Sequence, residues 1–278
     1  MNSQELFDKI NAKRSFLCVG LDSEFGKIPE FLKREQNPVF EFNRRIIETT
    51  APYAVAYKIN TAFYEAYGVS GWVNLRMTVD YLRANYADMF LIADAKRGDI
   101  GNTSKMYAKA FFDTIGFDAV TVSPYMGEDS IKPFTDYRGK WAIILALTSN
   151  QGAGTFQYTE DKYGGLMLFE KVIERSKSWG NTDNMMYVVG ATRTNMLKDV
   201  RRLAPDHFLL IPGVGAQGGS LSEVADAAMN DKCGLLVNSS RSIIFADTSE
   251  NFAEIAAQKA MEMQQEMAGL LSNKGIIK

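Results

Sequence analysis

Eight short apolar runs recur along the 278-residue chain and alternate with longer segments of helical period. The runs are continuously apolar and rich in β-branched residues, which is typical of parallel strands covered by helices. They span residues 16–22, 54–60, 89–96, 119–124, 141–149, 185–191, 207–214 and 234–240. Predicted helical segments include residues 37–51, 102–116, 166–180, 220–230 and 251–271.

This alternation predicts an α/β protein, a single (β/α)8 TIM barrel whose one catalytic domain spans residues 1–278. A doubly wound, Rossmann-like sheet is the alternative, because one miscounted strand would permit it. No G-x-G-x-x-G motif follows the first predicted strand, which argues against that alternative.

The composition narrows the functional classes. A formal net charge of −2 gives no support for broad nucleic-acid or membrane binding. Since no apolar run reaches membrane-span length and the N-terminus has no signal-peptide core, we expect a cytoplasmic protein. Cys18 and Cys233 lie in apolar surroundings, so we expect buried thiols and no disulfide. The single histidine, His207, opens an apolar strand, where we expect a structural role; a histidine-rich metal site is excluded.

Polar residues gather at the ends of the predicted strands, where a barrel carries its active groups. They are Asp22, Lys58, Asn60, Asp94, Lys96, Ser123, Thr148, Ser149, Ser240 and Arg241. Lys58 and Asp22, each taken alone, also fit simple structural roles at a strand end.

The most informative motif, D-A-K-R-G-D-I-G-N-T, ends the third strand. Strand alternation predicts that Asp94 and Lys96 point together into the barrel mouth while Ala95 faces the helices. Asp99 and Thr103 follow at the start of the next helix, where Asp99 could instead cap the helix. A purely structural ion pair would also explain the motif, but buried ion pairs are costly to assemble.

Charge alternation within this group has a chemical consequence. Asp94, Asp99, Lys58 and Lys96 could form a nearly neutral cluster. Nearby carboxylates keep a lysine protonated, so it is a poor nucleophile but a good proton donor.

Two loops follow the seventh and eighth strands, the common phosphate position of this fold. The first is glycine-rich, P-G-V-G-A-Q-G-G at 212–219, and the second places Arg241 at a predicted helix start. A structural connection would also explain the glycines.

The polar segment 150–165 after the fifth strand is either an active-site lid or an irregular surface excursion.

At these residues the chain resembles the orotidine 5′-monophosphate decarboxylase family, in its bacterial branch of about this length, from residues 20–22 to 239–243. The resemblance implies that Asp94 and Lys96 are catalytic. It implies that Asp99 and Thr103 reach across a homodimer into the neighbouring subunit's site. Asp22 and Lys58 match the residues that hold the ribose and complete the charge network.

The same resemblance implies roles for residues of the other loops. Ser149 matches the pyrimidine-reading serine, with Thr148 as the adjacent alternative. Gln217 matches a glutamine of the lid, and Arg241 matches the phosphate-binding arginine. Ser240 stands where the family often has glycine.

The implied reaction converts orotidine 5′-monophosphate to uridine 5′-monophosphate and CO₂ in pyrimidine biosynthesis, without metal or cofactor and with Lys96 as proton donor. Metal-dependent sugar-phosphate relatives share D-x-K-x-x-D but have an acidic group where this chain has Lys58. The sequence also leaves open a Schiff-base aldolase that uses Lys58 or Lys96, and a non-catalytic nucleotide-binding barrel.

Overall fold

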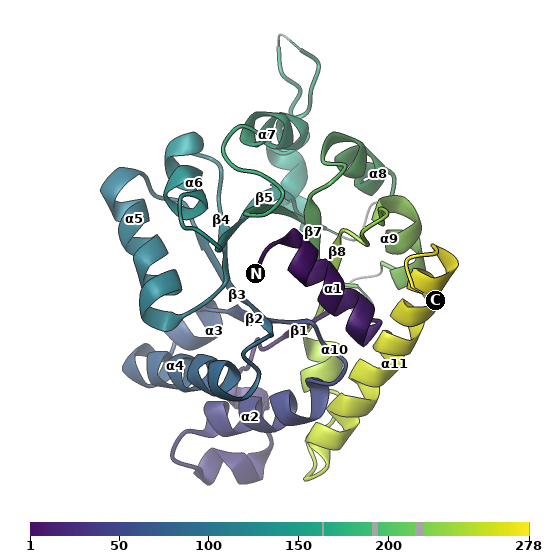
Figure 1. Cartoon of the computed structure of the whole chain (residues 1–278). Helices are drawn as coiled ribbons and strands as arrows, with labels where there is room; N and C mark the ends of the chain where they lie inside the picture. Colours follow the sequence, from purple (N-terminus) through teal and green to yellow (C-terminus); the bar gives the residue numbers. More distant parts are fainter. Residues whose placement is uncertain (163, 191–193, 215–218, 278) are drawn as a thin grey trace.

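The structure, a computed structural model, describes residues 1–162, 164–190, 194–214 and 219–277. Its centre is a closed barrel of eight parallel strands that follow one another in chain order (Figure 1). The strands are β1 Leu17–Gly20, β2 Ala56–Asn60, β3 Phe90–Arg97, β4 Ala119–Val122, β5 Trp141–Leu147, β6 Met185–Val189, β7 Phe208–Pro212 and β8 Leu235–Ser239. Each lies within its predicted run or passes it by one residue, so the predicted fold class is confirmed.

Helices surround the barrel and cover the outer face of the strands (Figure 1). They are α1 Ser3–Lys13, α2 Pro38–Thr50, α3 Ala62–Glu65, α4 Gly68–Asn85, α5 Gly101–Lys109, α6 Glu128–Thr135, α7 Leu168–Ser176, α8 Thr194–Leu203, α9 Leu221–Ala228, α10 Arg241–Ile244 and α11 Phe252–Asn273. A π-helical turn, η3 Ala110–Ile115, continues α5, and short 3-10 turns are η1 Phe25–Lys27, η2 Glu30–Arg34 and η4 Gln151–Thr155. Among the helices described, none is long and apolar enough to cross a membrane.

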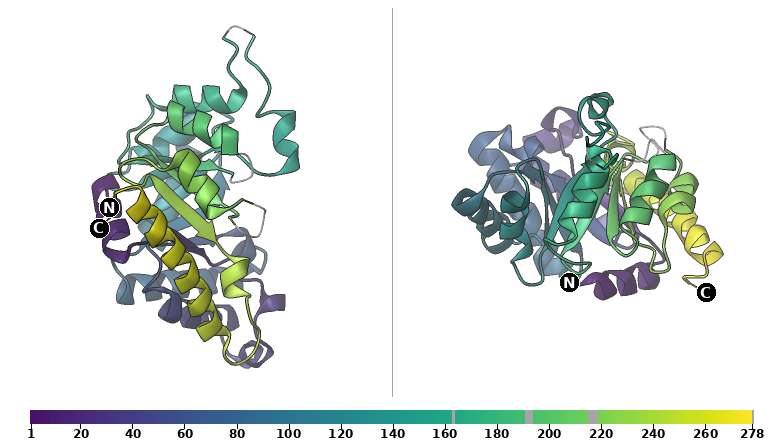
Figure 2. Two further views of the ribbon diagram at one scale, coloured as in Figure 1. Left: turned by 90° about the vertical axis from the view of Figure 1, so that its right-hand side faces the viewer. Right: turned by 90° about the horizontal axis from the view of Figure 1, so that it is seen from above.

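Helix α1 lies across the amino-terminal end of the barrel (Figures 1 and 2). It starts at a capping box, in which Asn2 accepts a hydrogen bond from the Glu5 amide and Glu5 accepts one from the Asn2 amide. Leu6 and Ile10 of this helix are fully buried. The helix therefore closes one end of the barrel and leaves the carboxyl ends of the strands as the open end.

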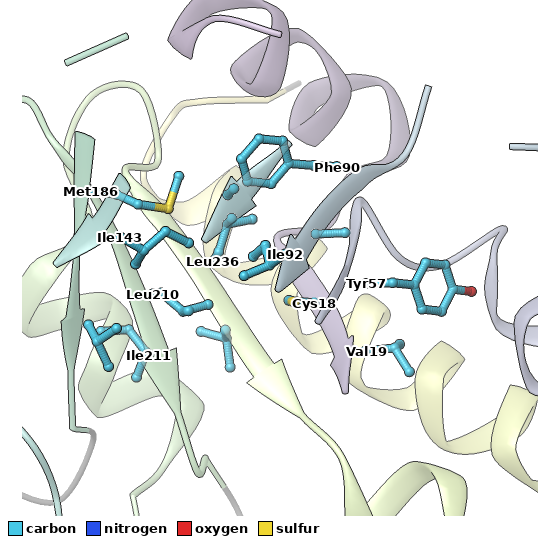
Figure 3. Close-up of a cluster of buried hydrophobic side chains, with 14 of the residues drawn as sticks. Cys18, Val19, Tyr57, Phe90, Ile92, Ile143, Met186, Leu210, Ile211 and Leu236 are labelled. Carbon is cyan, nitrogen blue, oxygen red and sulfur yellow. The ribbon is translucent and has the colours of Figure 1, made fainter. Parts of the chain in front are cut away.

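Apolar side chains fill the barrel and the space between barrel and helices (Figure 3). Tyr57 points outward from β2, and its hydroxyl forms a hydrogen bond of 2.8 Å with Thr50 of α2. Cys18 and Cys233 are buried free thiols, as predicted. His207 is buried beside the Tyr187 ring, and burial lowers its pKa to about 4, so its imidazole is neutral, in keeping with a structural role.

A close contact joins the ends of β1 and β8. A Cβ atom on Gly20 would lie 1.8 Å from Oγ and 2.9 Å from Cβ of Ser240. The space that a side chain at position 20 would need is therefore filled by Ser240, which precedes Arg241.

We expect Gly20→Ala to lower the free energy of unfolding by about 1–3 kcal/mol, because overpacking forces the two strand ends apart. Adding Ser240→Gly should recover most of that loss, which urea unfolding of the two single variants and the double variant measures. A double variant as unstable as the sum of the singles would show that contact with Ser240 is not the cause.

Candidate active site

The carboxyl ends of the strands surround a cavity of about 360 Å³. Its apolar floor includes Leu145, Val188 and Leu210. Its polar walls bring together residues that the sequence analysis singled out at separate strand ends, namely Asp22, Lys58, Asn60, Asp94, Lys96, Thr148, Ser149, Ser240 and Arg241. These residues lie far apart in the chain and meet because all eight parallel strands end on the same side.

Four charged groups form a continuous chain in this cavity. The Lys58 ammonium lies 3.2 Å from Oδ1 of Asp22 and 3.0 Å from Oδ2 of Asp94. The Lys96 ammonium lies 2.7 Å from Oδ1 of Asp94. Negative and positive charges therefore alternate, which compensates each charge at this partly buried position.

The side chains of Lys58 and Lys96 differ in their exposure to solvent. The side chain of Lys58 is 4% exposed, whereas that of Lys96 is 51% exposed. Lys58 is thus enclosed between two carboxylates, and Lys96 is the ammonium group that can reach a molecule in the cavity.

The pKa values of the two central groups reflect this pairing. Burial alone would lower the pKa of Lys58, but the carboxylates of Asp94 and Asp22 outweigh it and hold that pKa above its usual range. Burial alone would raise the pKa of Asp94, but Lys58 and Lys96 hold that pKa well below its usual range. Both groups are therefore charged at neutral pH.

Strand β3 departs from regular geometry where it carries this chain. Ala93 pairs with Val120 and Arg97 pairs with Val122, so three residues of β3 face the single residue Thr121. Lys96 has a φ of 47°, in the left-handed region that non-glycine residues rarely adopt. Asp94 and Lys96 do meet in the cavity as strand alternation predicted, but a bulge, not a regular strand, sets their geometry.

Thr121 stabilises the bulge and was missed by the sequence analysis. Its Oγ1 accepts a hydrogen bond from the Lys96 amide (2.9 Å) and donates one to Oδ1 of Asp94 (3.0 Å). The only signal in the sequence is a hydroxyl within the apolar fourth strand, and the register that places it opposite D-A-K cannot be read from the sequence.

Asp99 and Thr103 are not brought into the cavity of their own subunit. Asp99 has no ion pair within the described part of the chain, and its carboxylate accepts a hydrogen bond from the Ile100 amide (2.7 Å). It does not cap α5, whose N-cap residue is Ile100. Thr103 is exposed on the first turn of α5. Within one chain, the carboxylate that joins Asp94 on Lys58 is that of Asp22, and the role that the resemblance implies for Asp99 in a neighbouring subunit stays a prediction.

Thr148 and Ser149 both line the cavity after β5. The Thr148 hydroxyl already donates to Oδ1 of Asn150 (2.6 Å) and accepts from Nε2 of Gln157 (2.7 Å). The Thr148 hydroxyl is thus part of a hydrogen-bond network with the segment that follows β5.

The part of the cavity wall after β7 and β8 holds the candidate phosphate-binding groups. Gly213 and Val214, which begin the glycine-rich loop, line the cavity, and Gly213 has a positive φ of 86°. Arg241 is exposed at the start of α10 and lines the same cavity. Gln217 lies outside the described residues.

A cation site between the carboxylates is already filled by protein. The Lys58 ammonium lies where a metal ion bound by Asp22 and Asp94 would lie. Within the described residues, no group of three histidine, cysteine, aspartate or glutamate side chains is placed to hold a metal ion.

Comparison with known proteins gives one consistent family. The sequence model of the orotidine 5′-phosphate decarboxylase / HUMPS family matches residues 15–255. An orotidine 5′-phosphate decarboxylase of Parabacteroides distasonis is 61% identical over 277 residues, covering 100% of this chain and 99% of the relative. One from Porphyromonas gingivalis is 57% identical over 277 residues and covers 100% of both chains.

Solved structures agree with the sequence relatives. The structure of Leishmania donovani OMP decarboxylase is 35% identical, has a TM-score of 0.77, and covers 95% of this chain and 99% of that chain. The resemblance drawn from the strand-end motifs is therefore confirmed, and the chain belongs to the orotidine 5′-phosphate decarboxylase family.

Proposed function

We propose that the chain converts orotidine 5′-monophosphate to uridine 5′-monophosphate and CO₂, with Lys96 as the proton donor. Membership of the family makes the chain a carboxy-lyase. The observation that carries the proposed mechanism is the alternating chain Asp22–Lys58–Asp94–Lys96, of which Lys96 is the exposed end.

The reaction leaves an electron pair on C6 of the pyrimidine, where the ring has no evident sink for it. Stabilisation of the transition state on the order of 20 kcal/mol is then required. An ammonium group held in place before the reaction stabilises the developing charge without reorganisation and then donates its proton to C6. Lys96 meets this need because Asp94, 2.7 Å from its ammonium group, holds it in place at the cavity.

Asp94 would lie near the departing carboxylate in this arrangement. Its own charge is already compensated by Lys58 and Lys96 and by the Thr121 hydroxyl. The proposed chemistry needs no metal or cofactor, since the cation that faces the reacting carbon is a lysine and Lys58 occupies the space between the carboxylates.

The remaining roles are those that the family resemblance implies. We assign the pyrimidine to Ser149, the ribose to Asp22 and the phosphate to Arg241, all of which line the cavity, and to Gln217, which lies outside the described residues. Binding energy from the phosphate end aligns the ring at the reacting end. We further propose that residues 1–278 act as one catalytic domain in the cytoplasm.

We also propose a homodimer in which Asp99 and Thr103 enter the partner's site. The surface around them supports this, because large apolar side chains are exposed there. Ile100 is 47% exposed, Met106 53%, Tyr125 88% and Met126 55%. Such clustering is typical of a surface that another protein covers.

Lys96→Ala should lower turnover of orotidine 5′-monophosphate by at least about 10²-fold, because it removes the proton donor. Binding of uridine 5′-monophosphate, measured by calorimetry, should be partly retained. Lys198→Ala, at an exposed position of α8, is the matched control and should keep full activity. Full activity of Lys96→Ala would overturn the assignment.

Thr121→Val should lower kcat by about tenfold with little change in KM, because Asp94 and the Lys96 backbone lose a shared hydrogen-bond partner. Thr121→Ser keeps the hydroxyl and should restore most of kcat. If valine and serine variants behave alike, the hydroxyl does not position the charge chain.

Mixing of two inactive variants tests the dimer. Lys96→Ala and Asp99→Asn should each be nearly inactive alone. If Asp99 serves the partner's site, an equimolar mixture of refolded subunits regains about a quarter of wild-type activity, since half the dimers are mixed and each has one intact site. No recovery in dimers shown to be mixed would mean that Asp99 acts within its own subunit.

A further inference from the structure

The segment between β5 and α7 leaves the barrel as a long excursion (Figures 1 and 2). Its outer part forms an antiparallel bridge between Glu160 and Met167, and Asp161 pairs with Lys171 of α7 (2.6 Å). At its base, the side chain of Gln157 returns to the cavity wall.

Gln157 contacts Thr148 through both ends of its amide. Its Oε1 accepts a hydrogen bond from the Thr148 amide (2.8 Å), and its Nε2 donates one to Oγ1 of Thr148 (2.7 Å). Strand β5 ends at Leu147, so Gln157 provides the backbone partner that the strand no longer supplies to Thr148. A paired donor and acceptor on one residue fix both the position and the orientation of the amide.

The backbone of Gln157 is itself held on both sides. Its amide donates to the Ala153 carbonyl (2.8 Å), and its carbonyl accepts from the Phe169 amide in the first turn of α7 (3.2 Å). Gln157 therefore links the cavity wall to a fixed helix rather than to a free loop.

Gly190, the residue that follows β6, contacts the same wall. A Cβ on Gly190 would lie 2.7 Å from the amide nitrogen and 2.8 Å from Cβ of Ser149. The Gly190 amide donates to the Leu147 carbonyl (2.8 Å). Residues 147–149 are thus held between Gln157 and Gly190.

We propose that Gln157 is a positioning residue that sets the pyrimidine-reading end of the cavity by fixing Thr148 and, through it, Ser149. The inference rests on the proposed function, in which Ser149 contacts the pyrimidine. A hydroxyl that reads the polar edge of a base must be held to within a fraction of an ångström, and the Gln157 amide supplies that constraint. Gln157 touches no substrate atom in this arrangement and acts only through its neighbour.

Comparing the binding of two ligands distinguishes a positioning role of Gln157 at the pyrimidine from a general effect on the structure. Uridine 5′-monophosphate carries the pyrimidine, and ribose 5-phosphate carries only the sugar and phosphate. Gln157→Ala should weaken uridine 5′-monophosphate binding by about tenfold, the effect of losing a pair of partly buried hydrogen bonds. Ribose 5-phosphate binding should change by less than about twofold, because the phosphate end is untouched. Calorimetry measures both dissociation constants.

Further variants make the test specific. Gln157→Met keeps the volume without the amide and should match alanine, and it replaces alanine if that variant unfolds. Gln157→Glu keeps the acceptor for the Thr148 amide and should lose less than methionine. Gln151→Ala, at an exposed position in the same excursion, should bind both ligands normally.

Unchanged uridine 5′-monophosphate binding in Gln157→Met, or equal weakening of both ligands, would overturn the proposal. A glutamate variant as weak as methionine would show that the bond to the Thr148 amide does not set the position. Failure of the proposed reaction is distinguishable, because wild-type protein would then bind uridine 5′-monophosphate without turning over orotidine 5′-monophosphate.

Discussion

The Asp94 carboxylate is the group on which the rest of the site depends. It accepts hydrogen bonds from Lys58, Lys96 and Thr121, so three side chains from three strands converge on its two oxygens. A carboxylate this buried is stable in its charged form only when such partners are present. Removal of either lysine leaves a charge uncompensated, and removal of the Thr121 hydroxyl leaves Asp94 with one hydrogen bond fewer.

The partners of Asp94 are brought together by the topology of the barrel and by one local irregularity, the bulge in β3. Parallel strands bring Asp22, Lys58 and Asp94 to one end, while helix α1 closes the other end of the barrel. A regular strand β3 would not give Lys96 its observed conformation, because its φ of 47° requires the bulge that Thr121 stabilises. Backbone strain of this kind is often found at catalytic positions, where surrounding contacts maintain it.

Most of the fold and of the charged site could be predicted from the sequence, and the features that could not be predicted have physical causes. The eight apolar runs predict the barrel, and the polar strand ends predict Asp22, Lys58, Asp94 and Lys96 around one cavity. The register between two strands cannot be read from the sequence of either strand. The position of Thr121 opposite the D-A-K motif could therefore not be predicted. Gln157 was missed because its role depends on how a polar excursion folds back. The motif spacing suggested Asp99 as a member of the charge cluster, but within one chain Asp22 is the second carboxylate on Lys58.

The most direct test of this mechanism is the reaction of purified protein with orotidine 5′-monophosphate after exhaustive EDTA treatment. Absorbance follows loss of the substrate, and chromatography identifies the product. We predict that the substrate band disappears and that uridine 5′-monophosphate forms in equal amount without added metal. Folded protein that gives no product, or that gives product only when Mg²⁺ is restored, would contradict a mechanism built on the Asp22–Lys58–Asp94–Lys96 chain.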